Sequence, residues 1–253
     1  MIKGIVFDLD GTLYRGTEPV PGAADFVREA RRQGRRCLFV TNRASRTPET
    51  VCAQLNDLGI ESGPDDVLTA AQATAEYIGG GSVFMIGGEG LKRALEQHGV
   101  RLTDHQPDCV VVGYDPDLTY EKLAQACLLI LGGARFIGTN PDRIINTERG
   151  ALPGTGSLLA ALETATRVKP TIIGKPEPRI MTMALARMGL SPEQVLAVGD
   201  NLDTDIPAGS RSGMRTALML TGVSTRADLA AAPVQPDWIA ADYPTLTTLI
   251  YGG

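Results

Sequence analysis

Two aspartates separated by one residue stand just after the first apolar segment of the chain. Asp8 and Asp10 follow Gly4-Ile5-Val6-Phe7, and in an extended chain the side chains of positions i and i+2 face the same way. Two adjacent carboxylates repel unless a cation or a proton lies between them. The pair therefore indicates acid–base or cation chemistry, with a polar turn as the alternative. Gly11 and Thr12 then turn the chain, and we expect their backbone N–H groups to face an anion.

Polar residues that suit phosphate follow two further apolar segments. Thr41 and Asn42 come after Cys37-Leu38-Phe39-Val40. A hydroxyl and an amide can hold phosphate oxygens, although such a pair is also common in turns and helix caps. Lys175 follows Thr171-Ile172-Ile173 after one glycine. Because most lysines are solvated and few end an apolar segment directly, we predict that Lys175 is a cation held at a strand end.

An acidic loop follows the fourth apolar segment, Val195-Leu196-Ala197-Val198. It contains Asp200, the first charged residue after the segment, and Asp205. Acidic loops often cap the helix behind them, but the position of Asp200 favours a metal ligand. The four cysteines form no C-x-x-C pair, and the chain has only two histidines. Carboxylates would therefore have to hold a metal, which favours a hard cation such as Mg²⁺.

A sheet must bring these segments together. All four are continuously apolar rather than alternating, which is typical of parallel strands covered on both faces. Helices are predicted between them, over about 23–32, behind Pro48 and over about 178–188. This alternation predicts an α/β fold with a Rossmann-like, doubly wound parallel sheet. The strand ends of such a sheet lie at one edge, where ligands bind.

The middle of the chain carries a second series of strands and helices. The strands are predicted at 82–86, 109–112 and 135–137, and the helices at 91–97, 120–131 and 157–164. Residues 79–81 and 168–170 indicate hinges. We therefore predict an α/β cap domain of residues 71–172, inserted into a core domain made of residues 1–70 and 173–253.

The composition argues against several classes of protein. The formal net charge of −5 and 43% hydrophobic residues are ordinary for a globular chain. Because the chain is acidic overall, its charge does not indicate nucleic-acid binding. It also contains no block of Lys and Arg residues that would indicate binding to a membrane surface. Neither a membrane span nor a signal peptide is predicted. Because the cysteines are widely spaced, the cytoplasm is the expected compartment.

The four strand ends together have a recognisable order. They carry Asp8 with Asp10, then Thr41, Lys175 and Asp200. This order resembles the haloacid dehalogenase superfamily, and the resemblance extends over the whole chain. The long insertion is similar to the large α/β cap of its NagD-like, 4-nitrophenylphosphatase-like branch, as are segments 139–142 and 153–157.

The resemblance implies a phosphatase that works through an aspartyl-phosphate. Asp8 is the implied nucleophile, and Asp10 the acid that protonates the leaving oxygen and then activates water. Thr41 and Lys175 are implied to hold the phosphoryl oxygens. The implied holders of Mg²⁺ are Asp8, the Asp10 carbonyl and Asp200, with Asp205 in support. Electrostatics supports these roles, since a phosphate dianion approaches a carboxylate only where positive charge offsets the repulsion between them.

Other residues and readings stay open at this stage. Asn140 and Asp142 suit a proline-containing turn as well as they suit substrate contact. The expected partners are small phosphate esters, namely nucleotides, sugar or polyol phosphates and 4-nitrophenyl phosphate, and a homodimer is possible. A phosphotransferase or mutase would use the same residues, and a non-catalytic binding protein is a further alternative. Asp10 argues against a dehalogenase, in which the second acid is usually replaced.

Overall fold

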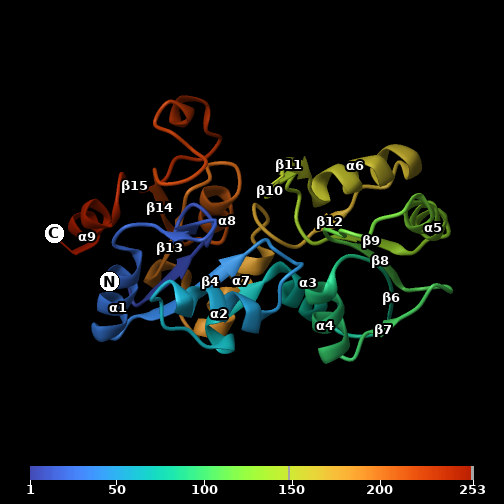
Figure 1. The fold of residues 1–253 in the computed structure, drawn as a ribbon, viewed down its shortest axis with the longest axis horizontal. Coiled ribbons are helices and arrows are strands. Elements are labelled where there is room, and N and C mark those ends of the chain that lie inside the picture. Colours follow the sequence, from blue (N-terminus) through green and yellow to red (C-terminus); the bar gives the residue numbers. More distant parts are fainter. Residues whose placement is uncertain (148, 252–253) are drawn as a thin grey trace. The chain divides into compact units, whose positions relative to one another are not determined.

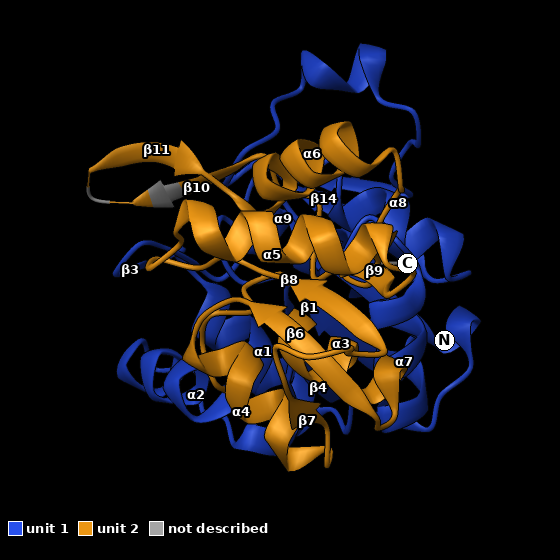
Figure 2. Ribbon diagram, turned by 90° about the vertical axis from the view of Figure 1, so that its right-hand side faces the viewer, with its two compact units in different colours: residues 1–41, 48–68, 175–253 blue, residues 42–47, 69–174 orange. Residues whose placement is uncertain are grey.

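The computed structural model describes residues 1–147 and 149–251, and Figure 1 labels its helices and strands. The chain forms two compact units, which are coloured separately in Figure 2. Unit 1 contains Met1–Thr41, Pro48–Leu68 and Lys175–Gly253, whereas unit 2 contains Asn42–Thr47 and Thr69–Gly174. Each unit has a parallel sheet of its own.

Unit 1 is built on a six-stranded sheet. Its strands are β1 (Gly4–Phe7), β4 (Arg36–Thr41), β5 (Val67–Thr69), β13 (Val195–Gly199), β14 (Arg215–Met219) and β15 (Trp238–Ala240). Their order across the sheet is β15-β14-β13-β1-β4-β5, and the pairs from β15 to β4 are parallel. β4 and β5, the next long strands of the chain, lie on one side of β1, and β13, β14 and β15 lie on its other side. The strand order therefore reverses at β1 and β13, which is where open α/β sheets bind ligands.

Amphipathic helices pack against this sheet. They are α1 (Ala23–Arg32), α2 (Pro48–Asp57), α7 (Arg179–Met188), α8 (Asp205–Arg211) and α9 (Tyr243–Tyr251). In α1 the buried residues are Ala23, Phe26, Val27 and Ala30, a three-to-four spacing that gives one apolar face. The Phe26 ring meets the Phe7 ring of β1 edge on, with 6.0 Å between centroids. This packing fixes the strand that leads into Asp8.

Short elements complete unit 1. A small antiparallel hairpin, β2 (Tyr14–Arg15) with β3 (Glu18–Pro19), directly follows the turn after β1. Short 3₁₀ helices lie in the connections, and they are η1 (Pro64–Asp66), η2 (Pro192–Gln194) and η3 (Asp228–Ala231). The last of these follows the loop that leaves β14.

Unit 2 contains a five-stranded parallel sheet with the order β12-β9-β8-β6-β7. Its strands are β6 (Ser82–Ile86), β7 (Arg101–Leu102), β8 (Cys109–Val112), β9 (Arg135–Gly138) and β12 (Thr171–Ile172). The helices are α3 (Ala70–Ile78), α4 (Glu89–Gln97), α5 (Tyr120–Leu131) and α6 (Thr155–Thr166), and β10 (Ile144–Thr147) forms a hairpin with β11 (Gly150–Pro153). Helices α5 and α6 cover one face of the sheet, and α3 and α4 cover the other (Figure 1).

The predicted α/β class and parallel sheets are confirmed, but one predicted strand lies elsewhere. The sequence analysis assigned Thr171–Ile173 to the core sheet. That assignment is wrong, because β12 pairs with β9 in unit 2, with Thr171 opposite Ile137. An apolar run cannot reveal which sheet will accept it, since both sheets bury their strands. The glycine run 79–81, predicted as a hinge, lies inside unit 2, where Gly79 ends α3.

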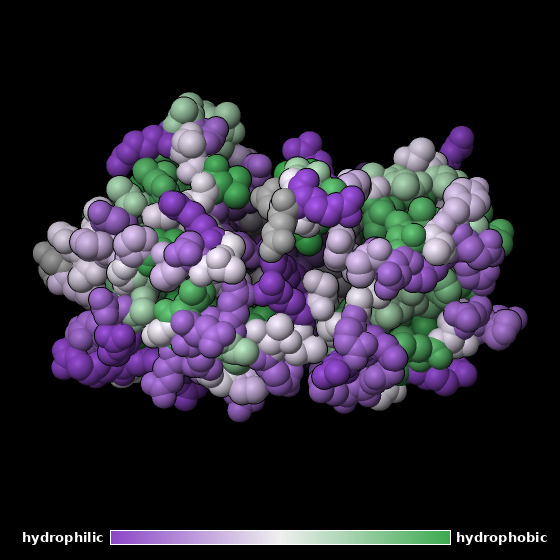
Figure 3. Space-filling view, in the orientation of Figure 1, coloured by the Kyte–Doolittle hydropathy of each residue, from purple (hydrophilic) through white to green (hydrophobic). Residues whose placement is uncertain are grey.

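The surface of unit 2 is partly apolar over α5. Tyr120, Leu128 and Leu131 are exposed there, and hydrophobic side chains are visible in this part of Figure 3. Among the described residues, no helix combines the length and the apolar character needed to cross a membrane.

Candidate active site

The two central strands of the unit 1 sheet each lead into an aspartate. Phe7 of β1 pairs with Val198 of β13, and the Asp8 N–H donates to the Val198 carbonyl at 2.9 Å. Asp200 lies two residues after Val198, the last β13 residue of this pairing. The parallel register thus brings the carboxylates of Asp8 and Asp200 to the same edge of the sheet.

Lys175 is buried between two carboxylates of this edge. Its side chain is 2% exposed, and its Nζ lies 2.5 Å from Asp8 Oδ1 and 2.7 Å from Asp205 Oδ1. The Val40 carbonyl lies 3.4 Å from the same nitrogen. Burial alone would lower the pKa of Lys175, but the charges of Asp205 and Asp8 raise it above its ordinary value. The lysine therefore remains a cation.

Asp205 connects Lys175 to the loop of Asp200. While its Oδ1 accepts from Lys175, its Oδ2 accepts the backbone N–H groups of Asp200 and Asn201, both at 3.1 Å. A Cβ on Gly199 would lie 2.3 Å from the Asp205 Cβ, so only glycine allows this approach. Both oxygens of Asp205 are thus engaged in positioning its neighbours.

The carboxylate of Asp200 is buried and held from two sides. Its Oδ2 accepts the Val223 N–H at 2.6 Å, and Thr12 Oγ1 lies 3.5 Å from its Oδ1, at the long limit of a hydrogen bond. Burial, with the charge of Asp205, raises the pKa of Asp200 to about 7. Burial likewise raises the pKa of Asp8 well above its ordinary value, against the opposing charge of Lys175.

These acids fit a divalent cation. Asp8, Asp200 and Asp205 each offer an oxygen, and the three atoms lie within 4.8 Å of one another. With one ammonium among three ionised carboxylates, the cluster would carry a net charge of −2. An all-oxygen donor set of this charge suits a hard divalent ion such as Mg²⁺. Asp205 accepts three hydrogen bonds, from Lys175 and from the Asp200 and Asn201 N–H groups, so its oxygens are more heavily engaged than those of Asp8 and Asp200.

The turn after Asp8 differs from the expectation in one respect. The Gly11 N–H donates to the Tyr14 carbonyl at 2.7 Å, and the Thr12 N–H donates to the Leu9 carbonyl at 3.2 Å. Both groups are therefore used within the turn, rather than facing an anion as the sequence analysis expected. Gly11 is needed for its positive φ of 84° and because a Cβ there would lie 2.3 Å from Asp200 Oδ2. The side chain of Asp10 on this turn is half-buried.

Thr41 and Asn42 fall in different units. Thr41 is the buried last residue of β4, in unit 1, whereas Asn42 belongs to unit 2. The amide of Asn42 donates to Asp142 Oδ2 at 3.2 Å, and the amide of Asn140 donates to the Asn42 carbonyl at 2.9 Å. The structure thus brings Asn42, Asn140 and Asp142 together in one hydrogen-bonded group. Asn42 was expected to act beside Thr41, but its amide contacts Asp142.

The sequence analysis missed the segment that contacts Asp200 from the other side. Val223 and its neighbours follow β14, which was not predicted because Arg215 and Thr216 interrupt its apolar character. The turn residues Thr221 and Gly222 were the remaining signal, since glycine after a strand often marks a close approach of the backbone.

Comparison with known proteins agrees with this geometry. A haloacid dehalogenase-like hydrolase model matches residues 5–101, and a HAD-hydrolase-like model matches residues 172–246. Together they cover more than half of the chain. The chain belongs to the haloacid dehalogenase-like hydrolases. The family resemblance predicted from the strand ends is therefore confirmed.

Relatives place the chain within this haloacid dehalogenase-like family. It is 47% identical over 228 residues to the 5'-nucleotidase YutF of Bacillus subtilis, covering 88% of this chain and 89% of that protein. It is 44% identical to an acid sugar phosphatase of Staphylococcus aureus over 95% of both chains.

Solved structures agree with the sequence relatives. The p-nitrophenyl phosphatase of Archaeoglobus fulgidus superposes with a TM-score of 0.93 at 33% identity, over 98% of this chain and 99% of that one. NagD of E. coli K-12 gives 0.90 at 35% identity, over 96% and 97%. Within the haloacid dehalogenase-like hydrolases, the chain falls in the phosphatase branch that contains NagD and the 4-nitrophenylphosphatases.

Proposed function

We propose that the chain is a Mg²⁺-dependent phosphatase that hydrolyses phosphate monoesters of small metabolites through an aspartyl-phosphate on Asp8. The observation that carries this proposal is the buried Lys175 ammonium, 2.5 Å from Asp8 Oδ1 inside a cluster of carboxylates. A cation at this position favours the ionised form of Asp8, against the effect of burial, and offers positive charge to an incoming phosphate.

The first half-reaction transfers the phosphoryl group to the protein. A carboxylate oxygen of Asp8 attacks phosphorus, a bond forms between them, and the bond from phosphorus to the ester oxygen breaks. Asp10 donates its proton to that oxygen, which leaves as the alcohol. Asp10 follows Asp8 by two residues, and its side chain is half-buried.

The second half-reaction restores Asp8. Asp10, now ionised, takes a proton from a water molecule, and the water oxygen attacks phosphorus. The bond between phosphorus and Asp8 breaks, so that inorganic phosphate and the free carboxylate are released. Two easier displacements thus replace one difficult one.

The other residues of the edge provide charge and orientation. Lys175 and the hydroxyl of Thr41 would hold the phosphoryl oxygens as charge spreads over them. Asp8, the Asp10 carbonyl and Asp200 would hold Mg²⁺, with Asp205 in support. When bound, Mg²⁺ supplies the positive charge that lets a phosphate dianion approach Asp8.

We further propose that the substrates are nucleotides, sugar phosphates and 4-nitrophenyl phosphate, since relatives bear the names 5'-nucleotidase, acid sugar phosphatase and p-nitrophenyl phosphatase. Unit 1 would act as the catalytic core domain and unit 2 as the cap domain that selects among them. The cysteines of the chain are free thiols, which supports a reducing compartment such as the cytoplasm.

Hydrolysis of 4-nitrophenyl phosphate tests the proposal. EDTA should abolish turnover and added Mg²⁺ should restore it, and Asp8→Asn should lower kcat by about 10⁴-fold or more. Undiminished activity in the chelator would exclude the metal, and full activity of Asp8→Asn would exclude the nucleophile. A kcat/KM survey of metabolite phosphates then identifies the preferred substrate, and added alcohols reveal any phosphoryl transfer.

A further inference from the structure

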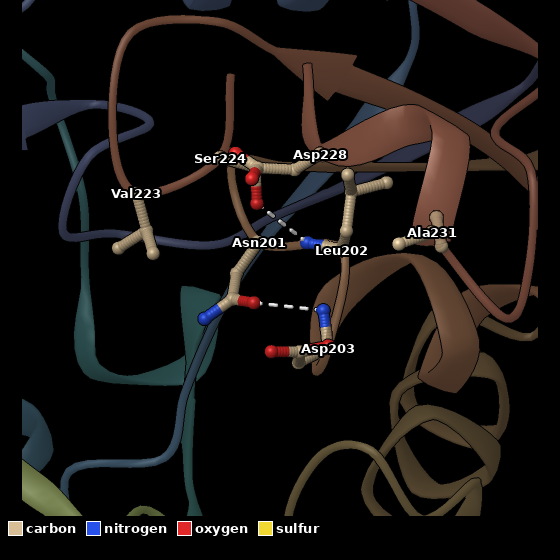
Figure 4. A pocket seen from close by; sticks show the side chains of 8 residues that line it. Asn201, Leu202, Asp203, Val223, Ser224, Asp228 and Ala231 are labelled. Carbon is tan, nitrogen blue, oxygen red and sulfur yellow. Dashed lines mark hydrogen bonds between the residues drawn. The ribbon is translucent and has the colours of Figure 1, made fainter. Parts of the chain in front are cut away.

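The turn Thr221–Ser224, which follows β14 in unit 1, is bonded to the loop of Asp200. The Val223 N–H donates to Asp200 Oδ2 at 2.6 Å, and the Ser224 N–H donates to the Asp200 carbonyl at 3.1 Å. The Ser224 hydroxyl accepts the Leu202 N–H at 2.9 Å (Figure 4). One short turn thus contacts the carboxylate and the carbonyl of Asp200 and the backbone N–H of Leu202.

The same turn is bonded to the loop that follows Asp8. The Thr221 hydroxyl donates to the Gly11 carbonyl at 2.6 Å, although the two residues are 210 positions apart. The Thr221 carbonyl accepts from Nε of Arg15, in strand β2 directly after that loop. Thr221 itself is buried. The turn Thr221–Ser224 therefore lies between the two loops that carry the proposed nucleophile and the proposed metal ligand.

Glycines make room for the Asp200 carboxylate in this arrangement. A Cβ on Gly222 would lie 1.9 Å from Asp200 Oδ2, and a Cβ on Gly11 would lie 2.3 Å from the same atom. The constraint at Gly222 is one of space, since its φ lies outside the left-handed region. Asp200 is thus enclosed by two glycine backbones, with one of its oxygens on the Val223 N–H.

The other side of the turn is partly open. A cavity of about 340 Å³ lies there, lined by Asn201, Asp203, Val223, Ser224, Asp228 and Ala231 (Figure 4). The side chain of Val223 is largely exposed. The hydrogen bonds of Thr221, Val223 and Ser224 therefore connect a partly open turn to both loops.

We propose that the turn Thr221–Ser224 is a positioning element for the reaction. Thr221 fixes the position of the loop that follows Asp8, and Ser224 fixes the position of the Asp200 loop. The inference rests on the proposed function for its catalytic consequence. Residues that orient the ligands of a metal typically change metal affinity or activity by about 10- to 100-fold when they are replaced. Neither Thr221 nor Ser224 touches the reacting atoms in this scheme.

The central experiment compares Thr221→Val with Thr221→Ser. Valine keeps the shape but removes the hydroxyl, whereas serine retains the hydroxyl. The matched control is Thr216→Val, which removes the buried hydroxyl of a threonine inside β14 that is bonded to Asp237 instead. Each full-length variant is measured by hydrogen–deuterium exchange, by calorimetric titration with Mg²⁺ alone, and by kcat and KM for 4-nitrophenyl phosphate.

We expect Thr221→Val to exchange faster over residues 9–14 and to bind Mg²⁺ about 10- to 100-fold more weakly. Its kcat should fall while its KM stays at the wild-type value. Thr221→Ser should restore all three properties. Thr216→Val should leave the exchange of residues 9–14 and the Mg²⁺ affinity at wild-type values, even where its thermal stability falls.

Ser224→Ala provides a second, independent variant should Thr221→Val fold poorly. It should increase exchange over residues 200–203 and weaken Mg²⁺ binding. Wild-type exchange at both loops in Thr221→Val and Ser224→Ala would overturn the inference. The exchange measurement needs neither metal nor substrate. If the wild-type protein proved inactive, the proposed function would be refuted, but the exchange data would still show whether the turn positions the two loops.

Discussion

Lys175 and Asp8 form a buried ion pair in unit 1, with 2.5 Å between Nζ and Oδ1. The residues are 167 positions apart, and the same ammonium lies 2.7 Å from Asp205. A single cation thus holds two of the three carboxylates that could ligate a metal. Removing it would leave buried negative charge without compensation, which is costly in a protein interior.

Replacing Lys175 should therefore affect both activity and folding. In Lys175→Met we expect kcat/KM for 4-nitrophenyl phosphate to fall by about 10²- to 10³-fold, the effect of removing one donor to developing charge. The free energy of unfolding should fall by about 3–5 kcal/mol, since a buried pair loses one partner. Lys122→Met is the control, because Lys122 pairs with Asp115 from a partly exposed position in unit 2. Unchanged kcat/KM in Lys175→Met would contradict the role of the ammonium.

Asp205 is predicted to act by holding its neighbours. Asp205→Asn keeps the size of the side chain but gives up the negative charge facing Lys175 and one of its two acceptor oxygens. We expect the apparent Mg²⁺ affinity to fall by about 10- to 100-fold, because the Asp200 loop loses its anchor. The measurement is the Mg²⁺ dependence of kcat.

A neighbouring acid serves as the control for this change. Asp203 lies in the same loop with an exposed side chain. Asp203→Asn should leave the Mg²⁺ dependence as in the wild type. Equal effects of the two substitutions would mean that only the general charge of the loop matters, which would refute a specific role for Asp205.

The sequence predicts those parts of the site that lie at the ends of uniformly apolar strands. β1, β4 and β13 contain such apolar runs. Asp8 follows β1, Asp200 follows β13, and Thr41 is the last residue of β4. Lys175 was assigned to the site, but from a strand that belongs to unit 2. The order of the polar residues along the chain therefore pointed to Lys175 even though the strand before it was assigned to the wrong sheet.

The parts that could not be predicted depend on contacts between distant segments. The Thr221 hydroxyl meets the Gly11 carbonyl across 210 positions, and no local pattern encodes such a pairing. Asn42 could not be placed either, because its amide contacts Asp142, 100 positions away. Periodicity reports which face of an element is buried, but not which remote backbone group a hydroxyl or an amide will meet.

Gly222 is predicted to be required for the orientation of Asp200. In Gly222→Ala the new methyl group would lie 1.9 Å from Asp200 Oδ2, so the carboxylate must move. We expect Mg²⁺-dependent kcat to fall by at least about 10-fold, as for other changes that displace a ligand. Titration with Mg²⁺ and steady-state kinetics measure this effect.

Gly63→Ala is the matched control for the glycine change. Gly63 also lies in unit 1, its φ is outside the left-handed region, and nothing lies within 4 Å of a Cβ built there. It should keep wild-type Mg²⁺ dependence. A Gly222→Ala protein that behaves like Gly63→Ala would show that Asp200 does not need the space observed here.

Tyr243 should make the stability of unit 1 sensitive to alkaline pH. Its buried hydroxyl donates to the Thr12 carbonyl at 3.0 Å, and burial, with the charge of Asp8, raises its pKa above the ordinary value. An unfolded tyrosine ionises near pH 10, about its reference value, while the folded one keeps its proton. The unfolded chain then binds fewer protons, so this residue lowers stability as pH rises above about 10.

Tyr243→Phe removes both the hydrogen bond and this ionisation. Near neutral pH the variant should be less stable by about 1 kcal/mol, the usual contribution of a hydrogen bond. Above pH 10, roughly the reference pKa of tyrosine, its stability should fall less steeply than that of the wild type, so the two curves converge. Urea denaturation over this pH range measures both effects, with Tyr120→Phe, an exposed tyrosine, as the control. Curves of wild type and Tyr243→Phe that stay parallel through this range would mean that Tyr243 ionises in the folded protein as readily as in the unfolded chain.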